Sequence, residues 1–136
     1  MQLKGRILNK GYAEGKAVVL DRAFSFIGDF DSATGELTID GHPLFGVSIA
    51  NCIFVIQTGK GGTITPFTAY EAKKNGKAPA AILCNEVEPL TAECAMTIDI
   101  PLMDAFGDDV TKVIKTGDFV KVNANTGVVE IVDSCK

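Results

Sequence analysis

Short runs of β-branched and aromatic residues, separated by turn signals, make up most of this chain. We expect seven strands from these runs, namely Leu3–Leu8, Lys16–Leu20, Glu36–Ile39, Cys52–Gln57, Ala80–Leu83, Phe119–Val122 and Val128–Val132. Residues 120–131 alternate apolar and polar positions on both sides of an Asn-Thr-Gly turn. That pattern is typical of a hairpin with one solvated face.

One helix is well marked between two of these strands. Thr65 can cap it, Pro66 takes the favoured first position, and Asn75-Gly76 ends it. The strand at 52–57, a glycine loop, this helix and the strand at 80–83 form a β-loop-α-β unit, which predicts a parallel strand pair. A weaker signal predicts a second short helix at Glu88–Ala95.

These elements predict a mixed α+β fold. We expect a small β barrel or sandwich that carries one βαβ layer. Neither a linker nor an internal repeat divides the 136 residues, so the interpretation is a single domain over residues 1–136.

Composition narrows the class of protein. Hydrophobic residues make up 46% and charged residues 22%, which indicates a folded globular chain. The net charge of -4 argues against a nucleic-acid partner, which needs a clustered basic face. The apolar runs are too short to span a membrane, and the first ten residues lack a secretory signal, so we expect a cytoplasmic protein with reduced thiols.

The cysteines and the single histidine give little support for metal chemistry. The four cysteines, at 52, 84, 94 and 135, contain no CxxC pair. Cys52 and Cys84 lie in apolar strand-like runs and are expected to be small buried hydrophobic residues. His42 lies in an Asp-Gly-His-Pro turn, where a turn role is favoured over a ligand role. We expect no metal or cofactor bound by this chain.

The glycine-rich segment at 58–65 is the first candidate site. It joins a buried strand to a helix N-terminus, where Gly59, Gly61 and Gly62 let backbone amides approach a ligand and Lys60 adds a full positive charge. This arrangement predicts binding of a carboxylate or phosphate. A tight strand-to-helix turn with no ligand is the alternative. The spacing fits neither a triphosphate-binding loop nor the dinucleotide pattern GxGxxG, so ATP and NAD have no support.

A serine and two carboxylates lie close together earlier in the chain. Ser25, Asp29 and Asp31 fall within seven positions, and paired carboxylates can hold a metal or share a proton. Residues 31–35 also form a plausible turn, and solvated turn carboxylates are the commoner case.

Several stretches together resemble a known family, the small subunits of the aconitase X dehydratases. The likeness covers most of the chain and rests on five ordered segments: Gly11–Leu20, Phe24–Gly35, His42–Ser48, Gly59–Gly61 and Ala78–Ile82. The resemblance implies a swivelling β/β/α domain that docks on a larger subunit, which would hold an iron–sulfur cluster. It implies dehydration of a hydroxy acid such as phosphomevalonate or cis-3-hydroxyproline, with the region around Ser25 facing the substrate or the interface.

The loop departs from the pattern that the resemblance implies. In this family a Gly-Arg-Gly-Ser-Ser sequence supplies a serine that acts as the base. Here Lys60 stands at the arginine, Gly62 at the first serine and Thr63 at the second. Thr63 is therefore the candidate catalytic residue, since the loop amides and Lys60 could lower the proton affinity of its alkoxide. Helix capping by Thr63 and Thr65 is the opposing interpretation.

Three functions compete. The first is a hydro-lyase subunit, inactive alone, that closes over a substrate held by its partner. The second is a phosphohistidine carrier domain, which also has Gly-Gly-Thr in its loop but needs a histidine there, and the sole histidine is His42. The third is a noncatalytic binding or scaffold paralogue, which the missing serine favours.

Overall fold

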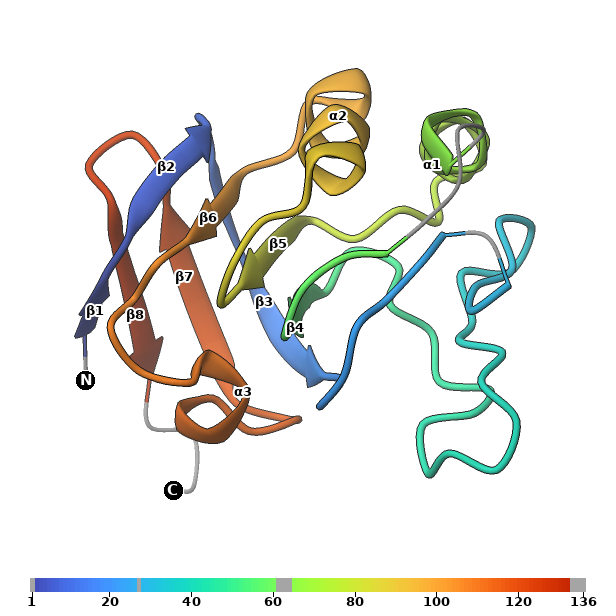
Figure 1. The fold of residues 1–136 in the computed structure, drawn as a ribbon, viewed down its shortest axis with the longest axis horizontal. Coiled ribbons are helices and arrows are strands. Elements are labelled where there is room, and N and C mark those ends of the chain that lie inside the picture. Colours follow the sequence, from blue (N-terminus) through green and yellow to red (C-terminus); the bar gives the residue numbers. More distant parts are fainter. Residues whose placement is uncertain (1, 27, 61–64, 133–136) are drawn as a thin grey trace.

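Eight strands and three helices make up the part of the chain described by the structure, a computed structural model that covers residues 2–26, 28–60 and 65–132 (Figure 1). In chain order the elements are β1 (Gln2–Lys4), β2 (Arg6–Asn9), β3 (Tyr12–Val19), β4 (Ile53–Ile56), α1 (Thr65–Lys74), β5 (Ala81–Cys84), α2 (Pro89–Ile98), β6 (Leu102–Asp104), α3 (Val110–Val113), β7 (Phe119–Asn123) and β8 (Val128–Val132). In these ranges no helix has the length and apolar character that a membrane crossing requires.

The first ten residues close the sheet into a barrel. The strand order is β1-β8-β7-β3-β4-β5-β6-β2, so the chain pairs with β8 before Gly5 and with β6 after it. A Cβ at Gly5 would lie 2.6 Å from Cε1 of Phe106 and 2.7 Å from the carbonyl oxygen of Asp104. The predicted strand Leu3–Leu8 is therefore split in two at a residue that only glycine fits.

The predicted βαβ unit is confirmed. Strands β4 and β5 are parallel, with Phe54 opposite Ile82 and Val55 opposite Leu83, and α1 lies between them in the sequence. Strand β3 runs parallel to β4 on one side, and β6 runs parallel to β5 on the other. The carboxyl ends of these four strands therefore meet at one edge of the sheet.

Strands β4 and β5 are buried on both faces and separate two hydrophobic cores. Ile53 and Val55 of β4 face the interior of the barrel, whereas Phe54 and Ile56 pack toward α1 and α2. This explains why both strands read as continuous apolar runs rather than alternating ones.

Of three further predicted elements, the structure confirms one, contradicts one and shifts the bounds of one. The hairpin is confirmed as β7 and β8, with Asn123 opposite Val128. The expected strand Glu36–Ile39 is wrong: the segment makes only isolated bridges, and Gly35 before it turns the chain at φ +77°. The second helix runs over Pro89–Ile98, not Glu88–Ala95, because Glu88 is its N-cap. Strand β6 and helix α3 were missed, since both are shorter than five residues.

Candidate functional site

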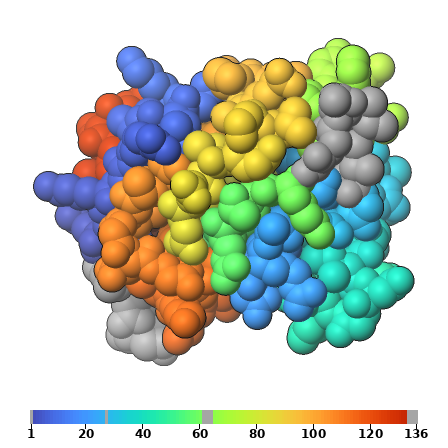
Figure 2. All heavy atoms as spheres, viewed as in Figure 1, coloured from blue at the N-terminus to red at the C-terminus, as the bar shows by residue number. Residues whose placement is uncertain are grey.

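The loop that leads out of β4 lies beside the segment that leads out of β3. The Phe24 N–H donates to the carbonyl oxygen of Thr58 at 3.0 Å, and the Lys60 N–H donates to the carbonyl oxygen of Phe24 at 2.8 Å. These bonds extend the parallel pairing of the two strands beyond their ends. In Figure 2 the green atoms of the segment ending at Lys60 lie at the surface between blue atoms of the segment after β3 and the yellow atoms that precede α2.

Asp29 joins two of the predicted site residues. One of its oxygens, Oδ2, accepts the backbone N–H of Ser25 at 3.1 Å and lies 3.5 Å from Nζ of Lys60. The carboxylate is mostly buried, whereas the lysine side chain is largely exposed. The structure therefore brings Ser25 and Lys60 together and leaves an ammonium group at the surface, held from below by a carboxylate.

Asp31, the second carboxylate of that stretch, has a different role. Its Oδ1 accepts the N–H of Ala33 at 2.9 Å, and its carbonyl oxygen accepts the N–H of Gly35 at 2.7 Å. The turn interpretation of residues 31–35 is confirmed. Asp29 and Asp31 share no contact that would make them a paired-carboxylate site.

Aromatic packing holds the segment that carries Ser25 and Asp29. The rings of Phe24 and Phe26 meet edge to face at 5.0 Å, and Phe30 contacts both. Phe24 also packs against Phe54 of β4 at 4.7 Å. Ser25 lies between Phe24 and Phe26 in the sequence and is itself buried. The packing of these rings therefore fixes the position of its backbone.

Gly59 is required by the first turn of α2. A Cβ at this position would overlap the hydroxyl of Thr91 and lie 2.8 Å from its Cβ. The Thr91 hydroxyl is in turn held by Glu88, whose Oε1 accepts the Thr91 N–H at 2.9 Å and its O–H at 3.0 Å. Close packing thus explains this glycine without a ligand, and its contact with substrate stays a prediction.

Sequence reasoning missed Glu88 and Thr91 as neighbours of the glycine loop. The only local signal was Pro89, which marks the first turn of a helix and therefore makes the preceding residue its cap. That this cap lies against Gly59 depends on how the loop after β4 packs on the start of α2, which no local pattern in the sequence specifies.

The segment between β5 and α2 is fixed to the rest of the site on two sides. The Thr58 hydroxyl donates to the carbonyl oxygen of Glu86 at 2.7 Å. Nδ2 of Asn85 donates to Asp109 at 2.9 Å, and bonds from Thr111 and Asn85 hold the pKa of the Asp109 carboxyl below its usual range. Three loops are thus joined rigidly at the carboxyl ends of parallel strands, where ligand sites of such sheets commonly lie.

The arrangement favours an anionic ligand. Lys60 supplies a positive charge at the surface, and the first turn of α1 contains no acidic side chain that would neutralise the positive end of its dipole. A carboxylate or phosphate at this edge would be attracted by both. Three of the predicted site residues, Gly61, Gly62 and Thr63, lie outside the described residues.

The two buried cysteines of the described residues, Cys84 and Cys94, and the histidine are used structurally. Burial raises the pKa of the Cys84 and Cys94 thiols to about 12, so both are protonated at neutral pH and poor metal ligands. His42 accepts the N–H of Leu44 at 3.0 Å through Nδ1, which confirms its turn role, and its Nε2 lies 3.3 Å from Asp21. Across residues 2–26, 28–60 and 65–132, no three His, Cys, Asp or Glu side chains gather as a metal site needs.

Comparison with known proteins gives a consistent match over the whole chain. A family model described as the aconitase X swivel domain matches residues 2–131. The phosphomevalonate dehydratase small subunit of Thermococcus kodakarensis is 44% identical over 133 residues, which cover 98% of each chain. That of Methanococcoides burtonii is 37% identical, with 98% of this chain and 97% of the relative covered.

Solved structures agree with the sequence matches. One chain of the crystal structure of Thermococcus kodakaraensis aconitase X, in its holo form, superposes with a TM-score of 0.90 at 43% identity, covering 98% of this chain and 99% of that one. A UPF0107 protein solved by solution NMR superposes with a TM-score of 0.89 at 35% identity, covering 98% and 100%. The fold predicted from the sequence is confirmed by these structures.

Proposed function

Because the chain belongs to the aconitase X swivel-domain family, we propose that it is the small subunit of a cytoplasmic dehydratase that acts on phosphomevalonate. A large subunit holds the hydroxy acid and an iron–sulfur cluster, and this chain closes over the bound substrate. The full-length identity of 37–44% to phosphomevalonate dehydratase small subunits carries the proposal. The alternative substrate within the same chemistry is cis-3-hydroxyproline.

The reaction removes water from a hydroxy acid. A base takes the proton from the carbon beside the carboxylate, the C–O bond to the hydroxyl breaks, and a C=C bond forms as the hydroxyl leaves with a proton as water. Every electron pair stays within the substrate and the water, so the reaction needs no oxidant or reductant. An iron–sulfur cluster in the large subunit would supply Lewis-acid assistance to the leaving hydroxyl.

The residues of this chain bind and orient the substrate. Lys60 attracts its carboxylate or phosphate, helped by the amides of Gly61 and Gly62 and by the N-terminal end of α1. Asp29 restrains the Lys60 ammonium at 3.5 Å, which fixes the charge where the anion arrives. Thr63 stands at the position of the family's second serine, and we assign the role of base to its alkoxide, which the positive charge of Lys60 would stabilise.

A noncatalytic paralogue is the second candidate. The observation that favours it is in the loop sequence, where Gly62 replaces the first serine of the family pattern and leaves Thr63 as the remaining hydroxyl. In that case the chain binds its partner and turns over no substrate.

The test is co-purification of the tagged chain from its native host, with mass spectrometry, an iron assay and a dehydration assay on what comes with it. The proposal predicts a large iron-containing partner and loss of phosphomevalonate, with cis-3-hydroxyproline unchanged. The Thr63→Ala variant should still bind the partner but lose turnover, whereas the Thr63→Ser variant should retain turnover. A complex that contains iron but dehydrates neither acid would support the noncatalytic paralogue. Recovery of the chain alone, folded and iron-free, would refute the dehydratase subunit and favour a stand-alone binding domain.

A further inference from the structure

Two aromatic side chains of α1 and a methionine of α2 are exposed on adjoining helices. Phe67 is 74% exposed, Tyr70 is 56% exposed and Met96 is 57% exposed. The rest of the exposed surface of α1 is polar, with Glu71, Lys73 and Lys74 among its residues. We call the surface of Phe67 and Tyr70 the aromatic ridge.

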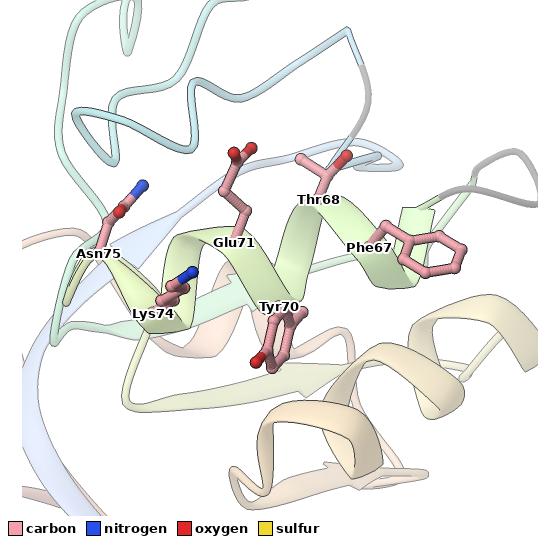
Figure 3. A pocket seen from close by; sticks show the side chains of 6 residues that line it. All are labelled: Phe67, Thr68, Tyr70, Glu71, Lys74 and Asn75. Carbon is pink, nitrogen blue, oxygen red and sulfur yellow. The ribbon is translucent and has the colours of Figure 1, made fainter.

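The aromatic ridge borders two hollows in the surface. Phe67 and Tyr70 line one of ≈ 390 Å³ together with polar residues of α1, and they line a second of ≈ 540 Å³ together with Glu93 and Thr97 of α2. Figure 3 shows Tyr70 pointing toward α2, whereas Thr68 and Glu71 point to the opposite side of the helix. The ridge therefore projects beside a groove between the two helices that other side chains can fill.

The chemistry of the aromatic ridge is that of a protein interface. Phe and Tyr are enriched at the centres of interfaces, and adjoining exposed apolar side chains often mark an interaction site. The opposite side of α1 already contacts the chain's own loop, because Glu71 accepts the Ser32 hydroxyl at 2.9 Å. The aromatic residues do not take part in that contact.

The position of the aromatic ridge indicates which protein binds it. Phe67 lies in the first turn of α1, directly after the glycine loop, and α2 contacts that loop through Thr91 and Gly59. Any partner whose bound substrate reaches Lys60 must cover the surface next to this loop. The relatives of this chain are named small subunits, which implies a large subunit for that position.

We propose that the aromatic ridge is the docking surface for the large subunit, an inference that rests on the proposed function. Phe67 and Tyr70 enter a complementary apolar surface of the partner. The interface is continuous with the glycine loop, so docking of the ridge sets the position of Lys60 over the substrate.

The test compares two variants of the full chain in binding to the large aconitase X subunit encoded in the same genome. The first is the double variant Phe67→Ser, Tyr70→Ser. The matched control is Tyr12→Ser on β3, because Tyr12 is a tyrosine of similar exposure, 51%, on another part of the surface. Since the altered side chains are exposed, circular dichroism and thermal melting should show that both variants fold as the wild type does.

The proposal predicts that the double variant raises the dissociation constant about tenfold or more, as removal of interface aromatic residues commonly does, while Tyr12→Ser leaves it unchanged. Equal binding by the double variant and the wild type would overturn the docking surface and leave the proposed function intact. A wild-type chain that forms a homodimer broken by the double variant would also overturn it. Failure of the wild type to bind any large subunit would instead refute the proposed function.

Discussion

The two sides of the molecule are built in different ways. On the barrel side, aliphatic residues of β4, β5, β7 and β8 fill the interior, and backbone pairing fixes each strand. On the loop side, the described residues 20–26 and 28–50 form only isolated bridges. Phe24, Phe26, Phe30 and Phe54 form an aromatic cluster against α1 and α2. Among the described residues of the candidate site, Ser25, Asp29, Gly59 and Lys60 lie on the loop side. A regular scaffold thus carries a surface whose shape depends on individual side chains.

The largest expected effect is the loss of Phe54, which joins the aromatic cluster to β4. Its side chain is fully buried and packs edge to face on Phe24. The Phe54→Ala change should lower the free energy of unfolding by about 3–5 kcal/mol, because it removes buried apolar surface and leaves a cavity. Urea unfolding measures this change.

The control for this variant is Phe45→Ala, which removes the same ring from an exposed position. It should change the free energy of unfolding by no more than about 0.5 kcal/mol. If the two variants were equally stable, the aromatic cluster would not hold the loop side.

The next effect concerns the contact between the glycine loop and α2. Gly59→Ala places a methyl group on the Thr91 side chain and should cost about 1–3 kcal/mol of stability through overpacking. It should also reduce turnover of the assembled enzyme, since the loop moves away from its position. Adding Thr91→Ala should recover part of both losses, measured by thermal melting and by the dehydration assay. A second change that restores neither would show that the Gly59–Thr91 contact does not position the loop.

A smaller effect on stability, with a large effect on function, is expected at Lys60. The lysine of the Lys60–Asp29 ion pair is largely exposed, so solvent screens the pair and it contributes about 1 kcal/mol or less. A charged hydrogen bond to substrate contributes about 1.5–3 kcal/mol, so Lys60→Met should raise KM about tenfold or more. Lys60→Arg, which restores the residue of the family pattern, should retain the wild-type KM. Equal KM values for the Lys60→Met and Lys60→Arg variants would show that Lys60 does not bind the substrate.

An effect that is absent at neutral pH and appears only above pH 9 comes from two buried thiols on the loop side. Cys84 and Cys94 both pack in the core of that side, where burial raises the pKa of each thiol from 9.0 to about 12. Because the folded pKa is above the unfolded one, this contribution to stability is full below pH 9 and is lost as the pH rises toward 12. The loss of stability between neutral pH and about pH 11 should therefore be smaller in a Cys84→Ala, Cys94→Ala variant than in the wild type. Identical losses would show that neither thiol is held neutral by the fold.

The sequence predicted the barrel side better than the loop side for a physical reason. The number of buried faces of a strand determines its sequence pattern. Strands β7 and β8 alternate, as expected for one buried face, whereas β4 and β5 are continuous apolar runs, as expected for two. Strand β6 carries the same signal but has only three residues, too few for a period to show. The split of the first strand depends on Phe106, a residue about a hundred positions away that crowds Gly5.

Part of the candidate site was predictable and part was not. Glycines before a helix and a lysine among them indicate anion binding from local chemistry alone, and this identified Lys60. The approach of Asp29 to Lys60 follows from the extended pairing of two loops, which no local pattern encodes. Ser25 was placed near the site by family resemblance, and the structure shows that its backbone, through Asp29, connects it to Lys60.

Hydrogen–deuterium exchange of the chain, free and bound to its large subunit, tests the contrast between the two sides most directly. We predict that binding slows exchange in peptides from Gln57–Lys60, α1 and α2, and leaves the β7–β8 hairpin unchanged. Protection of the β7–β8 hairpin, with none in α1 and α2, would contradict the assignment of function to the loop side.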